Sequence, residues 1–185
     1  MTKPKLRIGL IGSGFMGKAH AFGYSIAARV FDLPFELELH TIAEISNDTA
    51  AKAASSLGFA RATSDWRSLV ADPSIDVVNI TAPNALHKEM ALAAIARSKH
   101  VYCEKPLAPL AIDSREMAEA AEAAGVKTQV GFNYLCNPML GFARQRSRPE
   151  SLARYAATAV STPKTTWQTV LGRSPFGMTR RAAAH

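Results

Sequence analysis

The sequence KLRIGLIGSGFMG at residues 5–17 joins a short apolar run to three glycines and a helix-like segment. Residues 5–11 are typical of a buried parallel strand, because they are short, largely apolar and followed at once by glycine. Gly12, Gly14 and Gly17 form a GxGxxG pattern, which indicates phosphate binding when it lies between a strand and a helix. A helix is expected over residues 15–30, so the stretch predicts a strand, a glycine turn and a helix that bind a dinucleotide.

Each glycine has its own structural role in such a turn. Gly12 permits the tight turn, Gly14 leaves space for a pyrophosphate against the backbone, and Gly17 lets helix and strand pack closely. The phosphates would lie at the helix N-terminus, beside Phe15 and Met16, where free N–H groups and the helix dipole favour anions. The alternative is an ordinary strand-to-helix turn without a ligand.

The rest of the body alternates between strand and helix patterns. Further strands are expected at residues 37–43, 59–63, 75–81, 100–103 and 127–132, and further helices at residues 47–57, 66–71, 85–98 and 112–124. Strands separated by helices of this length imply right-handed crossovers between parallel strands. The predicted fold class is therefore α/β, with a doubly wound parallel sheet.

Composition narrows the class of protein. The chain has 185 residues, of which 48% are hydrophobic and 20% charged, which is an ordinary globular composition. No apolar run approaches the roughly 20 residues of a membrane span, and the first ten residues lack the apolar core of a signal peptide. Two cysteines, Cys103 and Cys136, make no disulfide framework. We expect no membrane partner, a reducing cytoplasm and no metal.

The positive charge is concentrated at one end. Residues 146–185 hold seven Lys and Arg and one Glu, so they carry +6 of the net charge of +7. A uniformly basic domain would favour nucleic acid as a partner. The first 145 residues carry only +1, and we expect no nucleic-acid partner.

Glu44 follows the second predicted strand, where an acid bonds the adenosine ribose hydroxyls and repels a 2′-phosphate. It lies further from the glycines than the usual spacing of about 20 residues, and the connection at residues 32–36 accounts for the excess. No Arg stands at residues 45–47, which favours NAD over NADP and leaves dual use open. The alternative is a solvated loop carboxylate.

Two segments follow later strands, at the edge where doubly wound sheets bind ligands. In the first, TAPNALH at residues 81–87, Asn84 caps the next helix or contacts a ligand, and His87 is a packing residue or a ligand contact. In the second, Glu104 and Lys105 follow the fifth strand. The lysine there can bond the nicotinamide ribose or polarise a substrate oxygen, and the alternative is a surface ion pair.

The segments taken in order resemble the N-terminal Rossmann domain of the Gfo/Idh/MocA family of NAD(P)-dependent oxidoreductases. They are IGSGFMG (11–17), AEIS (43–46), IDVVNITAPNALH (75–87), KHVYCEKPLA (99–108) and VGFNYLCNP (130–138). The resemblance implies that Lys105 is the lysine of the EKP motif, near the transferred hydride, and that Glu104 is its acid. It also implies that Pro83, Asn84 and His87 line the nicotinamide side, and that Asn133, Tyr134 and Pro138 lie at the passage into a second domain.

These inferences fix the candidate residues. Lys105 is the candidate catalytic residue, and the candidate cofactor-binding residues are Gly12, Gly14, Phe15, Met16, Gly17, Glu44, Thr81, Pro83, Asn84, His87, Glu104, Lys105 and Asn133. The expected cofactor is NAD and the expected substrate is a sugar or polyol.

The resemblance stops near residue 145. Members of the family have a second α/β domain with much of the substrate pocket, the usual oligomer interface and a downstream Asp and His. Residues 146–185 contain no Asp, and their one His is His185. We expect an NAD(P)-binding domain over residues 1–145, an irregular basic tail over residues 146–185, loss of the family's oligomer and impaired hydride transfer. The alternatives are a non-catalytic dinucleotide-binding module and a truncated remnant.

Two origins of the tail remain open: a natural sequence and a shifted reading frame. Regrouping the codons of PKTTWQT at residues 163–169 from one nucleotide upstream permits Glu-Asp-Tyr-Met-Ala-Asp, with the Ala forced by TGG. The same regrouping over residues 149–153 permits Ala-Gly-Glu-Leu-Gly. Both peptides resemble segments that the family carries early in its second domain, which favours the shifted frame.

Overall fold

The computed structural model describes residues 3–146. The chain divides into two compact units, Met1–Phe132 and Asn133–His185. The predicted tail lies outside the described residues, apart from Arg146, and so do the segments on which the shifted reading frame rests.

The first unit is built on one six-stranded sheet in which every neighbouring pair of strands is parallel. The strands are β1 (Lys5–Ile11), β2 (Glu36–Ala43), β3 (Arg61–Thr63), β4 (Val77–Ile80), β5 (His100–Cys103) and β6 (Thr128–Val130). Their order is β3-β2-β1-β4-β5-β6, so the doubly wound sheet is confirmed. The order reverses between β1 and β4, which opens a crevice at the carboxyl ends of these strands.

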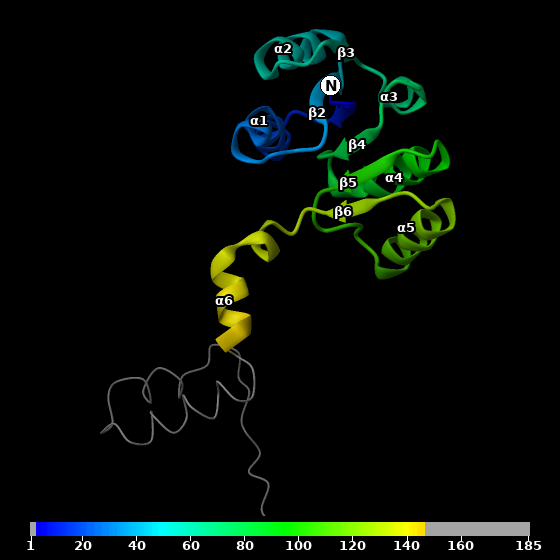
Figure 1. The fold of residues 1–185 in the computed structure, drawn as a ribbon. Helices are drawn as coiled ribbons and strands as arrows, with labels where there is room; N and C mark the ends of the chain where they lie inside the picture. Colours follow the sequence, from blue (N-terminus) through cyan, green and yellow to red (C-terminus); the bar gives the residue numbers. More distant parts are fainter. Residues whose placement is uncertain (1–2, 147–185) are drawn as a thin grey trace, which may run out of the picture. The chain divides into compact units, whose positions relative to one another are not determined.

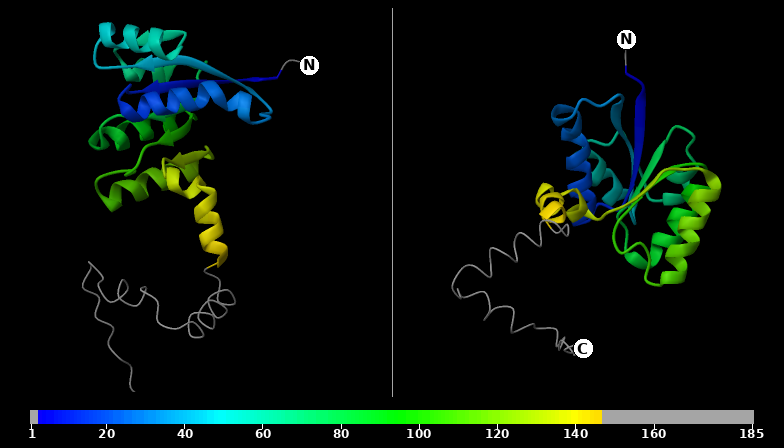
Figure 2. Two further views of the ribbon diagram at one scale, coloured as in Figure 1. Left: turned by 90° about the vertical axis from the view of Figure 1, so that its left-hand side faces the viewer. Right: turned by 60° about the horizontal axis from the view of Figure 1, so that its bottom comes forward.

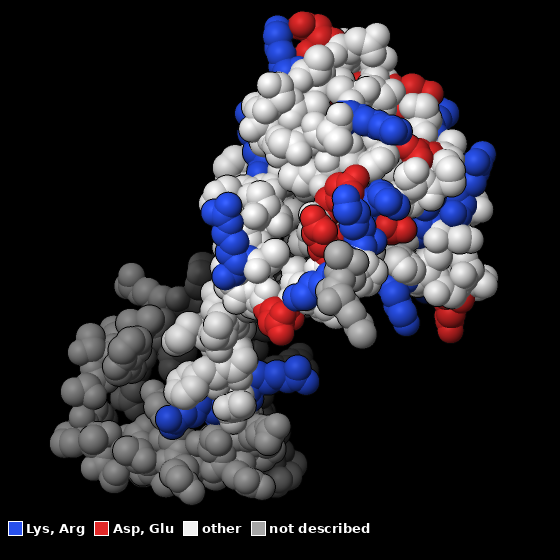
Figure 3. Space-filling model, turned by 45° about the horizontal axis from the view of Figure 1, so that its top comes forward, with Lys and Arg blue, Asp and Glu red and all other residues white. Residues whose placement is uncertain are grey.

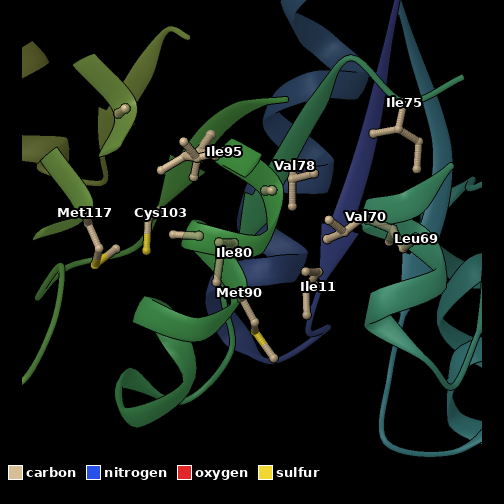
Figure 4. Packing of buried hydrophobic residues seen from close by; sticks show 14 of the residues in the cluster. Ile11, Leu69, Val70, Ile75, Val78, Ile80, Met90, Ile95, Cys103 and Met117 are labelled. Atoms are coloured by element: carbon tan, nitrogen blue, oxygen red, sulfur yellow. The ribbon is translucent and has the colours of Figure 1, made fainter. Parts of the chain in front are cut away.

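Helices cover both faces of the sheet (Figures 1 and 2). They are α1 (Phe15–Val30), α2 (Asn47–Leu57), α3 (Trp66–Ala71), α4 (His87–Ala96) and α5 (Ala111–Ala124), with a 3₁₀ turn η1 (Asn84–Leu86) before α4. One apolar cluster joins the sheet to α1 and α2, and a larger one joins it to α3, α4 and α5. Figure 4 shows the larger cluster, where side chains of these helices meet those of the central strands.

The side-chain alternation of β4 explains which face each residue meets. Val78 and Ile80 are fully buried in the larger cluster. Asn79 lies between them, so its side chain points to the opposite face, beneath α1. It is also fully buried, and a buried amide in a central parallel strand departs from the apolar pattern of such strands.

Local signals set both ends of α2, which spans the predicted residues 47–57. Ser46 accepts a hydrogen bond from the Thr49 N–H, and the Thr49 hydroxyl in turn accepts one from the Ser46 N–H, which makes a capping box at the start of α2. α2 ends at Gly58, whose φ of 80° is the left-handed conformation that glycine adopts without strain.

Several predicted boundaries differ from the structure. The strands expected over residues 59–63 and 127–132 are shorter, Arg61–Thr63 and Thr128–Val130. The helix expected from residue 85 begins at His87, because η1 occupies the preceding residues. The backbone of Pro83 is extended, with ψ 141°, so the chain leaves β4 as an extended segment and coils only after it. The strand expected over residues 75–81 is correspondingly shorter, Val77–Ile80.

The second unit contributes two described elements, η2 (Asn133–Cys136) and α6 (Pro138–Arg146). The sequence pattern did not predict α6. Its start has a clear local cause: the Asn137 side chain accepts the Met139 N–H at 2.9 Å, and Pro138 supplies a first helical residue that needs no N–H partner.

Charges of both signs are interspersed on the face of the first unit shown in Figure 3. Of the helices that the structure describes, none combines the length and the apolar character needed to cross a membrane.

Candidate functional site

A cavity of about 500 Å³ lies at the carboxyl ends of β1, β2 and β4. It brings together the glycine turn, the residue after β2, the start of α3 and the segment after β4. Its lining residues are Ile11, Gly12, Gly14, Ala43, Glu44, Ile45, Ser64, Trp66, Thr81, Ala82, Pro83, Leu86 and Met90. The predicted residues Gly12, Gly14, Glu44, Thr81 and Pro83 are therefore in one place.

The glycine turn leaves space on its outer side only. The φ of Gly12 is 94°, in the region that favours glycine. A Cβ on Gly17 would lie 2.1 Å from the Gly12 carbonyl oxygen, so no larger residue fits there. A Cβ on Gly14 would meet no protein atom within 4 Å. The backbone at Gly14 is therefore open to a ligand, which is the space that a pyrophosphate needs.

Thr81 holds this turn from the neighbouring strand. Its hydroxyl lies 2.7 Å from the Gly12 carbonyl oxygen and 3.1 Å from that of Ile11, and it donates to these oxygens. The predicted role of Thr81 was cofactor binding. The structure gives it a second role, because its hydroxyl fixes the turn on which a cofactor would rest.

The Glu44 carboxylate lies against the same turn. It accepts a short hydrogen bond from the Ser13 N–H, and its other oxygen accepts the Ile45 N–H at 3.2 Å. It is partly buried, so it is not a freely solvated loop carboxylate. A ribose diol beside the glycine turn would find here an acceptor already aligned with the loop.

The first turn of α1 provides donors for an anion. The first backbone bond within the helix runs from the Lys18 N–H to the Gly14 carbonyl, so the amides before Lys18 have no partner within α1. The first turn carries no acidic side chain that would repel an anion. Phe15, at 84% exposure, and Met16 flank these amides.

Pro83 and Asn84 lie in the segment that follows β4, and both are exposed. Of the two alternatives for Asn84, the helix cap is wrong, because α4 begins three residues later with Leu86 at its cap and no side-chain bond there. The Asn84 amide therefore stays available to a ligand.

His87 lies inside the protein, with none of its surface exposed. Its Nε2 is 2.9 Å from the Ala82 carbonyl oxygen and its Nδ1 is 3.0 Å from that of Pro106. The ring thus joins the segment after β4 to the turn after β5. This differs from the expectation that His87 lines the cofactor groove: the late start of α4 turns the residue inward, where both ring nitrogens have backbone partners.

Glu104 and Lys105 have opposite environments. Glu104 is 5% exposed, and its carboxylate contacts His20 Nε2 at 3.0 Å and the Lys105 backbone N–H at 3.1 Å. The alternative of a surface Glu–Lys pair is therefore wrong, and burial places Glu104 beneath the turn rather than in the groove. The Lys105 side chain is exposed, and among residues 3–146 its ammonium has no ion-pair partner. That ammonium is available to a ligand.

Asn133 and Tyr134 belong to η2, and Pro138 begins α6, in the second unit. The cofactor-binding role of Asn133, and the place of all three residues at the passage into a second domain, stay predictions.

Sequence reasoning missed several lining residues. Trp66, Leu86 and Met90 supply apolar surface to the cavity. Leu86 lies within the TAPNALH segment but was not singled out, and Trp66 and Met90 belong to no motif that marks a ligand. Within the described part of the chain, no group of three or more His, Cys, Asp or Glu could hold a metal ion.

Comparisons with known proteins agree with this geometry. The family model for Gfo/Idh/MocA proteins, described as an oxidoreductase family with an NAD-binding Rossmann fold, matches residues 6–132. A levoglucosan dehydrogenase from Pseudarthrobacter phenanthrenivorans is 41% identical over 150 residues, which cover 80% of this chain and 38% of that protein. An inositol 2-dehydrogenase from Acidothermus cellulolyticus is 36% identical over 132 residues, which cover 71% of this chain and 37% of that protein.

Solved structures give the same result. The crystal structure of an NAD binding oxidoreductase from Klebsiella pneumoniae has 52% sequence identity and a TM-score of 0.74, covering 77% of this chain and 38% of that chain. A levoglucosan dehydrogenase in complex with NADH and levoglucosan has 45% identity and a TM-score of 0.69, covering 70% of this chain and 35% of that chain. The chain thus spans less than two fifths of the length of these relatives, and the family-model match lies within its first unit. By its sequence and its fold, the chain belongs to the Gfo/Idh/MocA family of oxidoreductases with an NAD-binding Rossmann fold.

Proposed function

We propose that the first unit binds NAD in the cavity at the carboxyl ends of β1, β2 and β4. One observation carries the proposal: the open space over Gly14 and the Glu44 carboxylate lie on the same turn. The pyrophosphate would accept from the amides around Gly14, and Glu44 would accept from the adenosine ribose hydroxyls. Glu44 would repel a 2′-phosphate, so NAD is preferred over NADP.

The reaction that we propose is oxidation of a hydroxyl-bearing carbon of a sugar or cyclitol, which gives a hydride to NAD and its hydroxyl proton to water and becomes a carbonyl; the reverse reaction returns both to the carbonyl. Bound NAD supplies the nicotinamide carbon that takes up or gives the hydride. Lys105 would donate a hydrogen bond to the substrate oxygen, where negative charge develops as the carbon is oxidised or reduced. The substrate class rests on the relatives, which include dehydrogenases of levoglucosan and inositol.

A second candidate is dinucleotide binding without turnover. It is favoured by coverage, because this chain matches 35–38% of the length of the relatives compared above. In the family the second domain supplies much of the substrate pocket. We infer that residues 1–185, taken by themselves, bind the cofactor and transfer hydride poorly.

Titration of the full chain with NADH, followed by the nucleotide's fluorescence, tests binding. We expect saturable binding that weakens about tenfold or more in Glu44→Ala, since this variant loses hydrogen bonds to a charged acceptor. Glu119→Ala is the matched control, because it removes the same charge from an exposed position of α5. In the unmodified chain, NADPH should bind about tenfold more weakly than NADH. In Glu44→Ala, the two nucleotides should bind with equal affinity.

A turnover assay with NAD and a panel of sugars and cyclitols separates the two candidates. Turnover that disappears in Lys105→Ala would support hydride transfer. Saturable NADH binding without turnover on the panel would favour the non-catalytic module. A folded chain that does not bind NADH would refute both.

A further inference from the structure

A buried polar cluster lies beneath the Lys105 turn, and the proposed cofactor site does not use it. Its five side chains come from α1, β4, β5 and the turn itself: His20, Tyr24, Asn79, Tyr102 and Glu104. Asn79 is fully buried and Glu104 is 5% exposed. A buried carboxylate is unfavourable unless hydrogen bonds replace those that it would make with water. The partners of Glu104 therefore determine how the cluster is held together.

The Glu104 carboxylate bridges α1 and the Lys105 turn. Oε1 accepts from His20 Nε2 at 3.0 Å, although the two residues are 84 positions apart in the sequence. Oε2 accepts from the backbone N–H of Lys105 at 3.1 Å. A Cβ on Gly131 would lie 2.3 Å from Oε1, so the backbone of Gly131 closes the third side. The carboxylate is therefore held in one position between the helix and the turn.

The His20 ring is itself held on several sides. Its Nδ1 lies 2.9 Å from the amide nitrogen of Asn79, which also donates to the Tyr24 hydroxyl at 3.0 Å. Burial raises the pKa of Tyr24, so this hydroxyl is neutral and can accept. Nδ1 also lies 3.2 Å from the Asn79 side-chain oxygen. Because a carboxylate oxygen can only accept, the ring carries a proton on Nε2, which it donates to Glu104. The Tyr102 ring stands edge-on to the imidazole, with centroids 4.8 Å apart.

We propose that His20 is a positioning residue for Lys105: it fixes the Glu104 carboxylate, which in turn fixes the backbone of the turn that presents the Lys105 ammonium. α1 begins at the glycine turn, so the helix that receives the pyrophosphate also carries His20. The link therefore sets the distance between the phosphate end and the Lys105 end of the site. Its use in catalysis rests on the proposed function, whereas the link itself is a property of the protein alone.

Amide hydrogen exchange of the full chain labelled with ¹⁵N-lysine tests the link without a cofactor. The Lys105 amide signal is assigned from its disappearance in Lys105→Arg. The Lys99 N–H, which donates to the Ala94 carbonyl at 3.0 Å, reports the stability of the surrounding fold. We compare the unmodified chain with His20→Ala, with His20→Gln and with the control His100→Ala, whose ring lies outside the cluster.

In His20→Ala the Lys105 amide should exchange about tenfold faster, because its charged acceptor loses the partner that holds it. The Lys99 amide should keep its rate. His20→Gln should restore most of the protection, because the Gln amide nitrogen can donate to Glu104. His100→Ala should leave Lys105 unchanged. If His20→Ala does not fold, Glu104→Gln gives the same test, because a neutral amide is a weaker acceptor for the Lys105 N–H.

An unchanged Lys105 rate in a folded His20→Ala or Glu104→Gln variant would overturn the proposal. So would parallel acceleration of Lys99 and Lys105, since that would make His20 a residue of general stability. Failure of the unmodified chain to bind NADH would refute the proposed function and leave the exchange result standing, so the two failures are distinguishable.

Discussion

Substitution of Gly14 by valine should abolish most cofactor binding and leave the fold intact. Gly14 has φ −61° and ψ −171°, which is extended backbone that valine adopts readily. No protein atom lies within 4 Å of the added Cβ. The free energy of unfolding should therefore change by less than about 1 kcal/mol, the usual size of a surface substitution with a small cap effect.

The valine side chain would fill the space over the glycine turn that a pyrophosphate needs. Loss of one or two hydrogen bonds to a charged group costs about 1.5–3 kcal/mol each. The Kd for NADH should therefore rise at least about tenfold, and about a hundredfold if two bonds are lost.

Gly17→Ala is the matched comparison, because it adds a smaller group at the same turn. Its Cβ would lie 2.1 Å from the Gly12 carbonyl oxygen and 2.9 Å from the Thr81 hydroxyl oxygen. Such overpacking against backbone costs about 1–3 kcal/mol or more, so the urea midpoint should fall in this variant and not in Gly14→Val.

Urea unfolding followed by circular dichroism, together with NADH titration, decides between the two effects. The reasoning is refuted if Gly14→Val lowers stability as much as Gly17→Ala does. It is equally refuted if the NADH affinity of Gly14→Val stays within about threefold of the unmodified chain.

Three further substitutions or treatments test other parts of the site. Thr81→Val removes the hydroxyl that donates to the Gly12 and Ile11 carbonyls. Urea unfolding should show that the free energy of unfolding falls by about 1 kcal/mol, and NADH titration should show a weaker affinity. Unchanged values would contradict the role of Thr81 in holding the turn. His87→Leu removes the imidazole that lies between the Ala82 and Pro106 carbonyl oxygens, to one of which a neutral ring donates. Thermal unfolding should therefore show a loss of about 1–3 kcal/mol, and full stability would contradict the role of His87 in joining the two segments. Burial, followed by the charge of Glu104, raises the pKa of the Cys103 thiol to about 12. The thiol therefore stays protonated at pH 8, and peptide mapping should find it unmodified by iodoacetamide in the native protein and modified in urea.

The sequence anticipated the sheet because the information lies in local patterns. Apolar runs of strand length alternate with helix patterns, and a capping box and a glycine mark the ends of α2. The glycine turn was predicted in the same way, since its three glycines stand between a strand and a helix. The position of Glu44 followed from the parallel strands, whose carboxyl ends share one edge of the sheet.

The predictions that differed from the structure concern side-chain environments. Of the two alternatives for Asn84, the helix cap is wrong, because the helix begins three residues later. His87, which the resemblance placed at the groove, is instead the packing residue of the other alternative. Both differences come from one event, the short 3₁₀ turn after Pro83. α4 begins two residues later than expected, and helix propensity does not fix a boundary that closely.

The sequence by itself determined the fold class, the family and the residues that form the glycine turn, because each depends on residue types at short spacing. Only the tertiary structure decided how these residues are held. The Thr81 hydroxyl reaches Gly12 across 69 positions, and His20 reaches Glu104 across 84. Such hydrogen bonds arise where packed helices and strands bring distant side chains together and exclude water, so that a buried carboxylate or carbonyl must find its partner within the protein. The spacing of residues in the sequence does not show which distant side chains pack together. Only the tertiary structure therefore shows that Glu104 is buried while its neighbour Lys105 is exposed.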